Sequence, residues 1–208
     1  MKSYQQFCSV AHALDVVGDR WVLLIVRELL TFGPSRYSDL KRALPGVASN
    51  LLAERLKTME TDGIVEQIDA PAPIGTRLYG LTERGRELED VVRALSKWGL
   101  STMIGGPGDG EAIQSQWIAL LGGLTLSSSS PVWIGIDGEG EQVSLQLDEQ
   151  GFSIRRGIPG GADVTLAGTA HVIGGVLAGL ITLAAAKKYG LKVTGRAELI
   201  TELVGAAQ

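Results

Sequence analysis

The side chains that most often catalyse reactions or bind metals are scarce in this chain of 208 residues. It contains one cysteine, Cys8, and two histidines, His12 and His171. One cysteine cannot form an intrachain disulfide, and two isolated histidines do not make a zinc site of the usual spacing. Nucleophile-elbow, phosphate-loop and zinc-protease motifs are absent from the sequence. We therefore expect a binding protein rather than an enzyme, without a metal or a cofactor.

A second group of side chains could bind the phosphates and base edges of nucleic acid. Arg36 and Arg77 each lie beside a predicted turn, from which a long cationic side chain can reach a phosphate. Ser49 and Asn50 open a predicted helix, where they could cap the helix or contact bases and phosphates. The candidate DNA-binding residues are Arg36, Ser38, Ser49, Asn50, Arg55, Lys57 and Arg77.

Arg55 and Lys57 in this set have two interpretations. Both lie on the helix that begins near Ser49, and a cationic side chain on such a helix can contact DNA. Either one could instead pair with Glu54 or interact with the end of the helix. The sequence leaves both alternatives open.

The elements that must position these residues are read from hydrophobic periodicity and from helix-stop residues. Apolar residues at helical spacing predict a helical region over residues 16–29, interrupted at Gly18-Asp19, and a short helix over residues 39–44 with Ser38 as its N-cap. A further helix is predicted over residues 48–61, ended by Gly63. Strands over residues 64–68 and 77–81 flank a loop at residues 69–76. This order is that of a winged helix-turn-helix, which can place one helix in the major groove and a hairpin tip on neighbouring phosphates.

Five segments carry a specific resemblance to a known family. They are LDVVGDRW at 14–21, LIVREL at 24–29, RYSDL at 36–40, NLLAERL at 50–56 and YGLTERG at 79–85. They resemble the HxlR-type branch of the MarR-like winged-helix transcription regulators. The resemblance implies a bacterial regulator, expected to be a repressor, that binds a double-stranded DNA operator as a homodimer. It also implies that residues 48–61 form the recognition helix and residues 69–76 the wing.

The resemblance has one visible departure, near the start of the chain. The family often has Cys-Pro-Val there, whereas Cys8 is followed here by Ser9-Val10. A lone cysteine is often a small buried hydrophobic residue, whereas redox sensing needs an exposed thiol of lowered pKa. The sequence does not decide between these two roles.

The charge distribution divides the chain near Gly105. Residues 1–104 contain 13 Lys and Arg against 13 Asp and Glu, whereas residues 105–208 contain 6 against 10, so the net charge of −4 belongs to the second half. Residues 105–110, with the sequence GGPGDG, cannot continue a helix and indicate a linker. We expect a winged-helix DNA-binding and dimerisation domain at 1–104 and a second domain at 111–208.

A long amphipathic helix is predicted over residues 82–103. Its apolar side could pack on its own domain or form a helix-helix contact between two subunits, which the family resemblance favours. The candidate dimer-interface residues are Leu88, Val91, Val92, Leu95 and Trp98.

The second half of the chain has an α+β pattern. An apolar helix is predicted over residues 117–126, and strands over residues 132–136, 143–147, 152–154, 163–168 and 191–195, with helices between and after the last two. The fold class is therefore a mainly α winged helix-turn-helix domain followed by an α+β domain with a sheet of roughly five strands. Alternation in residues 143–147 predicts that one face of the sheet is in contact with solvent.

The segment from Asp163 to Gly168, the apolar helices after it and the segment from Leu191 to Gly195 resemble the sterol-carrier-like lipid-binding fold. The resemblance implies an apolar small molecule or lipid as ligand, although the same residues could be plain core, and the domain could be only an oligomerisation module. The candidate ligand-binding residues are Trp117, Leu121, Trp133, Val172, Val176, Leu177 and Leu180.

Residues 164–186 form a stretch without charged side chains that is long enough for a membrane span. The stretch contains four glycines and begins with strand-like alternation, so we expect buried structure in a soluble domain and no membrane insertion. The first residues lack the pattern of a secretory signal, and we expect a cytoplasmic protein.

Overall fold

The computed structural model describes residues 3–69, 75–103, 105–138 and 141–206. It divides into two compact units, Met1–Val92 and Arg93–Gln208, which are described separately. The division falls within helix α6 (Leu88–Gly99), and the linker predicted at residues 105–110 lies inside the range of the second unit. Arg93, near the middle of α6, donates a hydrogen bond to the carbonyl of Leu124, which ties the end of α6 to that unit.

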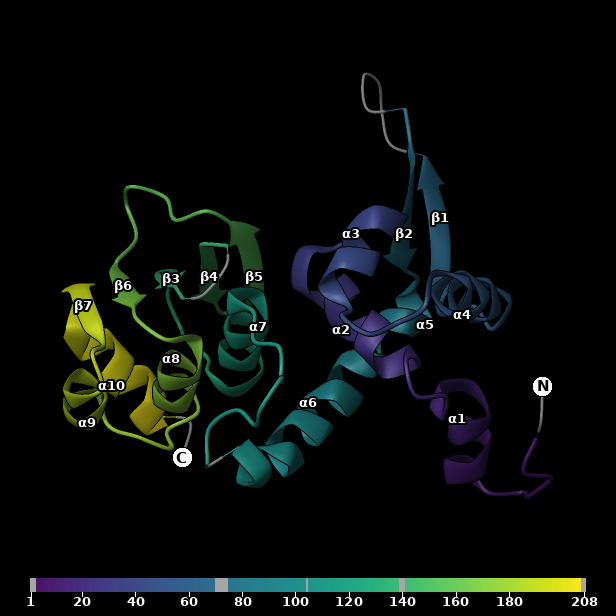
Figure 1. Ribbon diagram of the computed structural model, residues 1–208, viewed down its shortest axis with the longest axis horizontal. Coiled ribbons are helices and arrows are strands. Elements are labelled where there is room, and N and C mark those ends of the chain that lie inside the picture. Colours follow the sequence, from purple (N-terminus) through teal and green to yellow (C-terminus); the bar gives the residue numbers. More distant parts are fainter. Residues whose placement is uncertain (1–2, 70–74, 104, 139–140, 207–208) are drawn as a thin grey trace. The chain divides into compact units, whose positions relative to one another are not determined.

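Within its described residues, the first unit contains four helices, a two-stranded hairpin, a short fifth helix and the start of α6 (Figure 1). In chain order these are α1 (Ser9–Val17), α2 (Val22–Phe32), α3 (Tyr37–Ala43), α4 (Ser49–Thr61), β1 (Val65–Asp69), β2 (Arg77–Leu81) and α5 (Glu83–Arg86). The strands are antiparallel, with Val65 opposite Leu81 and Asp69 opposite Arg77. The predicted winged helix-turn-helix arrangement of α3, α4 and the hairpin is confirmed. Residues 70–74 of the predicted wing loop lie outside the described residues.

One apolar side of each of the helices α2, α3 and α4 forms the core of this unit. Their fully buried side chains include Ile25, Val26, Leu40, Leu52, Leu56 and Met59. Full burial of a side chain of this size stabilises the fold by about 1.5–3 kcal/mol. Packing of the predicted apolar stripe of α4 therefore fixes which side of that helix faces solvent.

Two helix boundaries differ from the predictions. The helix predicted to begin after Ser38 begins at Tyr37, with Arg36 as its N-cap, so Ser38 is not the capping residue. The reason is an isolated bridge in which Ser35 and Tyr79 exchange two backbone hydrogen bonds, which holds the chain extended immediately before Arg36. The N-cap of α4 is Ala48, and Ser49 lies in the first turn.

The single long helix predicted over residues 82–103 is interrupted. It consists of α5, a turn at Glu87, α6 and a 3₁₀ turn at Leu100–Met103. Thr82 caps α5 by accepting a hydrogen bond from the backbone N–H of Gly85. Gly85 lies so close to the residue before β1 that a Cβ atom there would be 2.1 Å from the carbonyl oxygen of Ile64. This contact fixes α5 against the start of the hairpin, and α6 begins only after the turn at Glu87.

After the end of α6 and the 3₁₀ turn, the described residues of the second unit form a five-stranded sheet and four further helices. The elements are α7 (Ser115–Thr125), β3 (Val132–Asp137), β4 (Val143–Asp148), β5 (Gly151–Arg156), β6 (Val164–Ala167), α8 (Ala170–Leu177), α9 (Leu183–Lys188), β7 (Lys192–Gly195) and α10 (Ala197–Ala206). The strand order is β5-β4-β3-β6-β7, in which only the pair β3–β6 is parallel. The predicted α+β domain with five strands is confirmed.

The uncharged stretch at residues 164–186 is divided among β6, α8 and the start of α9. Among the helices of the described ranges, none has the length and apolar character needed to cross a membrane. The stretch instead contributes buried residues to the second unit, among them Val164, Leu166, Ile173 and Val176.

Helix α7 packs closely on one face of the sheet. A Cβ atom at Gly122 would lie 2.9 Å from Leu145 and 3.2 Å from Leu177, and one at Gly123 would lie 2.5 Å from Phe152. The two glycines therefore allow α7 to approach β4 and β5, and Gly122 also allows a close approach to α8.

The opposite face of the sheet is only partly in contact with solvent, contrary to the prediction. Ser144 alternates with the core residues of β4 but is 1% exposed. Its neighbour in register is Gly135, which Ile158 approaches so closely that a Cβ atom there would lie 2.8 Å away. The segment between β5 and β6 thus covers this part of the face, which the sequence of β4 alone cannot indicate.

Candidate nucleic-acid interface

The exposed side of α4 is the centre of the candidate interface. Leu52, Leu56 and Met59 point into the core, so the side chains at the other positions of the helical repeat face solvent. Exposed residues on α4 are Ser49, Asn50, Ala53, Glu54, Lys57, Glu60 and Thr61. Of the candidates, the structure places Ser49, Asn50 and Lys57 on this side. It also places Ala53 and Glu54 there, which the site prediction missed although their spacing from Asn50 was visible.

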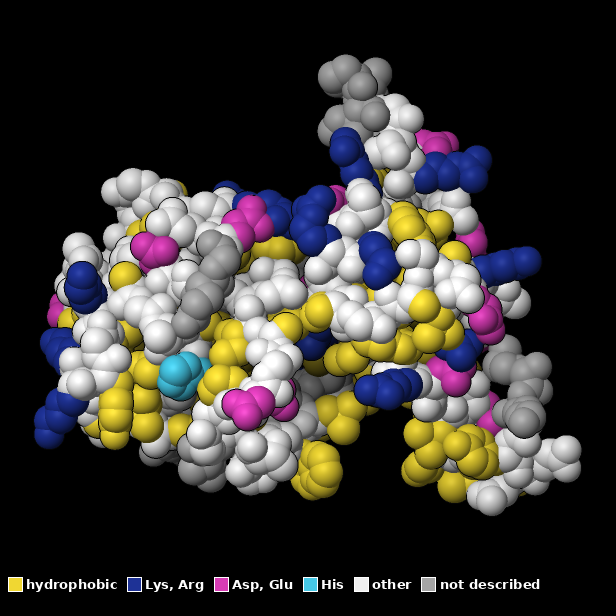
Figure 2. All heavy atoms as spheres, viewed as in Figure 1, with side chains coloured by type: hydrophobic (Ala, Val, Ile, Leu, Met, Phe, Trp, Pro, Cys, Tyr) yellow, Lys and Arg dark blue, Asp and Glu magenta, His cyan; other side chains and the backbone are white. Residues whose placement is uncertain are grey.

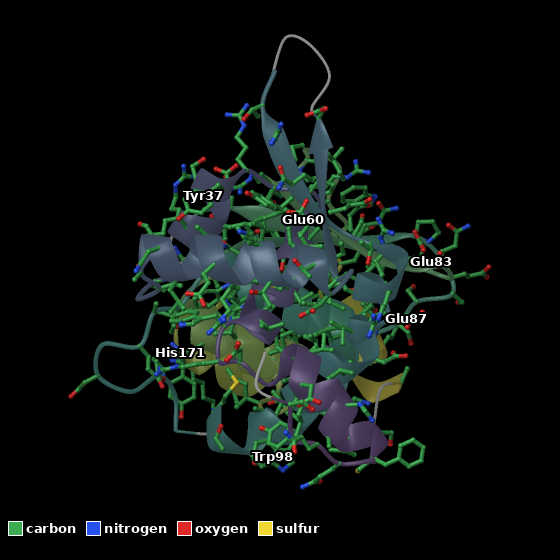
Figure 3. All side chains as sticks on the ribbon, turned by 90° about the vertical axis from the view of Figure 1, so that its right-hand side faces the viewer. Tyr37, Glu60, Glu83, Glu87, Trp98 and His171 are labelled. Carbon is green, nitrogen blue, oxygen red and sulfur yellow. The ribbon has the colours of Figure 1, made fainter. Side chains whose placement is uncertain are left out.

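Hydrogen bonds from α3 hold the start of α4 in place. The hydroxyl of Tyr37 donates to the carbonyl of Ser49 at 2.7 Å, and the Lys41 ammonium donates to the carbonyl of Val47 at 2.6 Å. Tyr37 and Glu60 lie toward opposite ends of α4 in Figure 3. The first turn of α4 is therefore positioned by a side chain of the preceding helix, which the sequence analysis did not identify.

Arg55 occupies a different side of α4 from Asn50 and Lys57. Its guanidinium lies 2.9 Å from the Asp19 carboxylate and 3.6 Å from that of Glu54, and its side chain is 19% exposed. Asp19 belongs to the turn between α1 and α2. The structure thus pairs Arg55 with Glu54, as one of its two interpretations had it, and more closely with Asp19 in the turn before α2, a partner that the sequence analysis did not identify.

The hairpin presents Arg77 next to the predicted wing loop. The Arg77 side chain is 74% exposed; its guanidinium donates a hydrogen bond to the side-chain oxygen of Gln67 at 3.3 Å and lies 4.0 Å from the Asp69 carboxylate. Gln67 in turn donates to Glu60 at 3.0 Å, which connects the hairpin to the end of α4. The Arg77 side chain is accessible to a ligand, and its contacts with Gln67 and Asp69 orient the guanidinium.

Arg36 and Ser38 lie together at the exposed start of α3. Arg36 at the start of α3, Lys57 on α4 and Arg77 on β2 are cationic side chains from three different elements of this unit. Figure 2 shows Lys and Arg side chains around the base of the hairpin. This arrangement can bind a phosphate backbone on both sides of an inserted helix.

Helix α6 carries the candidate dimer residues. Its exposed apolar residues are spaced three and four apart: Val91 is 40% exposed, Leu95 47% and Trp98 79%. Leu88 is half-buried, whereas Val92 is 8% exposed and faces the folded protein. The structure therefore brings Val91, Leu95 and Trp98 together on one accessible stripe and leaves Val92 out of it.

The candidate ligand residues of the second unit do not form one group. Leu121, Val172, Val176 and Leu177 are buried on α7 and α8, whereas Trp117 is half-buried and Leu180 is 42% exposed.

Trp133 lies on the sheet face opposite these helices, because it alternates along β3 with the inward Ile134. The guanidinium of Arg155 is 5.0 Å from the centre of its ring. Trp133 therefore cannot line a space between α7, α8 and the sheet.

Cys8 is exposed and is the N-cap residue of α1. Hydrogen bonds from the backbone N–H groups of Ala11 and Val10 lower the pKa of its thiol. The thiol is thus accessible and is not the buried hydrophobic residue that was one of its two interpretations.

Comparisons with known proteins match the sequence of the first half of the chain. Residues 16–104 match the HxlR-like helix-turn-helix family. The HTH-type transcriptional regulator YvaP of Bacillus subtilis is 38% identical over 86 residues, which are 41% of this chain and 79% of YvaP. The regulator YodB of the same organism is 35% identical over 86 residues, covering 41% of this chain and 76% of YodB. The structure of reduced YodB superposes with a TM-score of 0.40 at 32% identity, covering 50% of this chain and 100% of YodB.

Proposed function

Because the chain belongs to the HxlR-like helix-turn-helix family of DNA-binding transcription regulators, we propose that it acts as a homodimeric, MarR-like repressor on a two-fold-symmetric operator. The observation that carries the proposal is the exposed side of α4, flanked by Arg36 at the start of α3 and by Arg77 at the hairpin. In this proposal α4 enters the major groove, and the two helices of a dimer meet successive groove segments about 34–36 Å apart.

The cationic candidates divide into phosphate contacts and one positioning residue. Arg36 and Arg77 are exposed and flank α4, so they are proposed to contact phosphates together with Ser38 and Ser49. Asn50 and Lys57 are proposed to reach base edges. Arg55 is proposed to hold α4 through Asp19, because its guanidinium is largely covered and ion-paired.

Salt dependence separates these roles. Each phosphate contact adds about 0.9 to the slope of log affinity against log salt, so Arg77→Ala should lower the slope of a dimer by about 2. Arg55→Ala should weaken operator binding with the slope unchanged. The measurement is a fluorescence-anisotropy titration of operator DNA at several salt concentrations. A slope that falls as much for Arg55→Ala as for Arg77→Ala would assign Arg55 to the phosphates instead.

The repressor assignment is tested by transcription in vitro. Addition of the protein to a template that carries its operator should lower the transcript yield. A rise in yield would make the protein an activator while leaving DNA binding intact.

The dimer is proposed to form through the α6 stripe of Val91, Leu95 and Trp98. A helix with such a stripe buries it on a second copy of itself in an isologous contact. Trp98→Glu places a charge in this contact and should convert the dimer to a monomer in sedimentation velocity, with weaker operator binding. Lys97→Glu changes the charge on another side of α6 and should leave the dimer intact. An unchanged dimer in a folded Trp98→Glu variant would move the interface elsewhere.

The second unit is proposed to be a sterol-carrier-like domain, beginning at residue 111 after a linker at 105–110, that binds an apolar small molecule or lipid. A sheet covered on one face by apolar helices supports this assignment, as does the apolar side of α8, with Val172, Val176 and Leu177. A ligand that favours one geometry of the dimer would change operator affinity, and DNA would reciprocally change ligand affinity.

Native mass spectrometry of the protein as expressed tests the ligand directly. A retained apolar molecule, or binding of added fatty-acyl or isoprenoid probes, is expected. Absence of any retained or added ligand would make the unit an oligomerisation module. Equal probe affinity with and without operator DNA would contradict regulation by the ligand.

A further inference from the structure

We propose that Glu54 determines operator specificity by accepting a hydrogen bond from a cytosine in each half-site. The proposal rests on the proposed binding of α4 in the major groove. Glu54 was not among the residues that the sequence indicated as DNA-binding, and its side chain is 67% exposed on α4. A carboxylate at this position needs an explanation, because DNA phosphates repel it.

The position of Glu54 follows from the helical repeat of α4. Asn50 precedes it by four residues and Lys57 follows it by three, so the three side chains share one side of the helix. Ala53 lies on the same side, and Leu52, Leu56 and Met59 lie opposite, in the core. The side chains that α4 offers to a groove are therefore an amide, a methyl group, a carboxylate and an ammonium group.

The cation next to Glu54 does not remove the carboxylate from this side. Arg55 makes its shorter ion pair with Asp19, at 2.9 Å, whereas its guanidinium is 3.6 Å from Glu54. Arg55 is directed toward the turn before α2, and among the described residues its ion pair with Glu54 involves one carboxylate oxygen, so the exposed carboxylate can face a ligand at the surface. Lys57 is consequently the cation of α4 that faces outward, since α4 contains only these two cations.

The chemistry of the major groove identifies the base. A carboxylate accepts hydrogen bonds only, and the cytosine N4 amino group is the donor that Glu and Asp contact there. Adenine also offers a donor, but next to an acceptor, which suits an amide such as Asn50 better. Repulsion from the phosphates lowers affinity for every sequence, and the hydrogen bond restores it only where cytosine is present. Glu54 thus acts mainly by discriminating against other sequences.

Selection of operators from a library of randomised DNA duplexes tests this assignment. The full-length protein and its variants Glu54→Gln, Glu54→Ala and Glu87→Gln are compared at one fixed salt concentration. Glu87 is an exposed carboxylate outside α4 and provides the control for loss of one negative charge (Figure 3). All three substitutions are at exposed positions, and circular dichroism verifies folding.

The wild type should select a cytosine at one position of each half-site, where another base costs about tenfold in affinity. Glu54→Ala should lose this preference and bind unrelated DNA more tightly. Glu54→Gln should change the preference from cytosine to adenine, because an amide pairs with the donor and acceptor of adenine. Glu87→Gln should retain the wild-type preference.

Two failures are distinguishable. If the wild type selects no duplex, the proposed DNA binding itself is wrong. If the wild type selects an operator and both Glu54 variants keep every base preference, the DNA binding stands and the role of Glu54 is overturned. A uniform gain in affinity that Glu87→Gln shares, without a change of preference, also overturns it.

Discussion

Gly195 and Gly190 offer a matched pair for testing how the second unit is closed. Both have a backbone φ of +88°, a left-handed conformation that an alanine adopts at a cost of about 1–2 kcal/mol. A Cβ atom at Gly190 would meet nothing within 4 Å, whereas one at Gly195 would lie 2.3 Å from the carbonyl oxygen of Asp163. The two alanine variants therefore share the backbone strain and differ in the steric clash.

The size of the difference follows from the contacts around that carbonyl. An ordinary carbon-oxygen contact is about 3.3 Å, so Gly195→Ala must move the end of β7 away from β6 by about 1 Å. The backbone N–H of Arg196 donates to the same Asp163 oxygen at 2.8 Å, and Gly195 pairs with Val164 at the end of the ladder. Loss of these two interactions costs about 1 kcal/mol each. We expect the free energy of unfolding to fall by about 1 kcal/mol for Gly190→Ala and about 3 kcal/mol for Gly195→Ala.

Urea denaturation followed by circular dichroism measures both values. The transition midpoint should fall further for Gly195→Ala, with the slope unchanged. Equal destabilisation of the two variants would show that β7 is not held to β6 at this point, and the described register of the edge strand would then be refuted.

Three further predictions concern single residues. Gly85→Ala should destabilise the first unit by about 2 kcal/mol in urea denaturation, because its Cβ atom would displace α5 from the carbonyl of Ile64 and break the hydrogen bonds of Thr82; greater stability from the better helix former would contradict the contact. The backbone N–H of Trp133, assisted by Arg196, lowers the pKa of Asp163, so the stability advantage of wild type over Asp163→Ala should be complete above about pH 4 and disappear as the pH falls further; a pH-independent difference would rule out the charge. Cys8, with its lowered pKa, should react with iodoacetamide at neutral pH faster in the folded than in the urea-unfolded protein; equal rates would show that the N–H groups of α1 do not stabilise its thiolate.

The sequence predicted the elements of both units because local signals and packing agree there. In α4, the apolar spacing of Leu52, Leu56 and Met59 matches the buried side, and Gly63, with a φ of +69°, follows the helix end as its stop signal suggested. The strands of the second unit were likewise predicted from alternation and from turn residues. In these segments the spacing of apolar residues matched either a helix or a strand, but not both.

The features that were missed depend on residues distant in the sequence. Arg55 forms its shorter ion pair with Asp19, which is 36 positions earlier, and the spacing of residues along a helix cannot predict this pair. Ser144 is buried by a segment that follows β5. The sequence of β3 does not indicate on which face of the sheet Trp133 lies, because the residues beside it are apolar as well. The start of α3 depends on the bridge between Ser35 and Tyr79.

Capture of genomic DNA by the purified protein tests the central claim most directly. Fragments of DNA from the organism that encodes the chain are bound to the immobilised full-length protein at physiological salt, washed and sequenced. We predict enrichment of a small set of fragments that share a two-fold-symmetric sequence, with half-sites about 10 base pairs apart. Recovery of fragments in proportion to their abundance in the genome, without a common sequence, would contradict the account of α4 as the recognition helix of a transcription regulator.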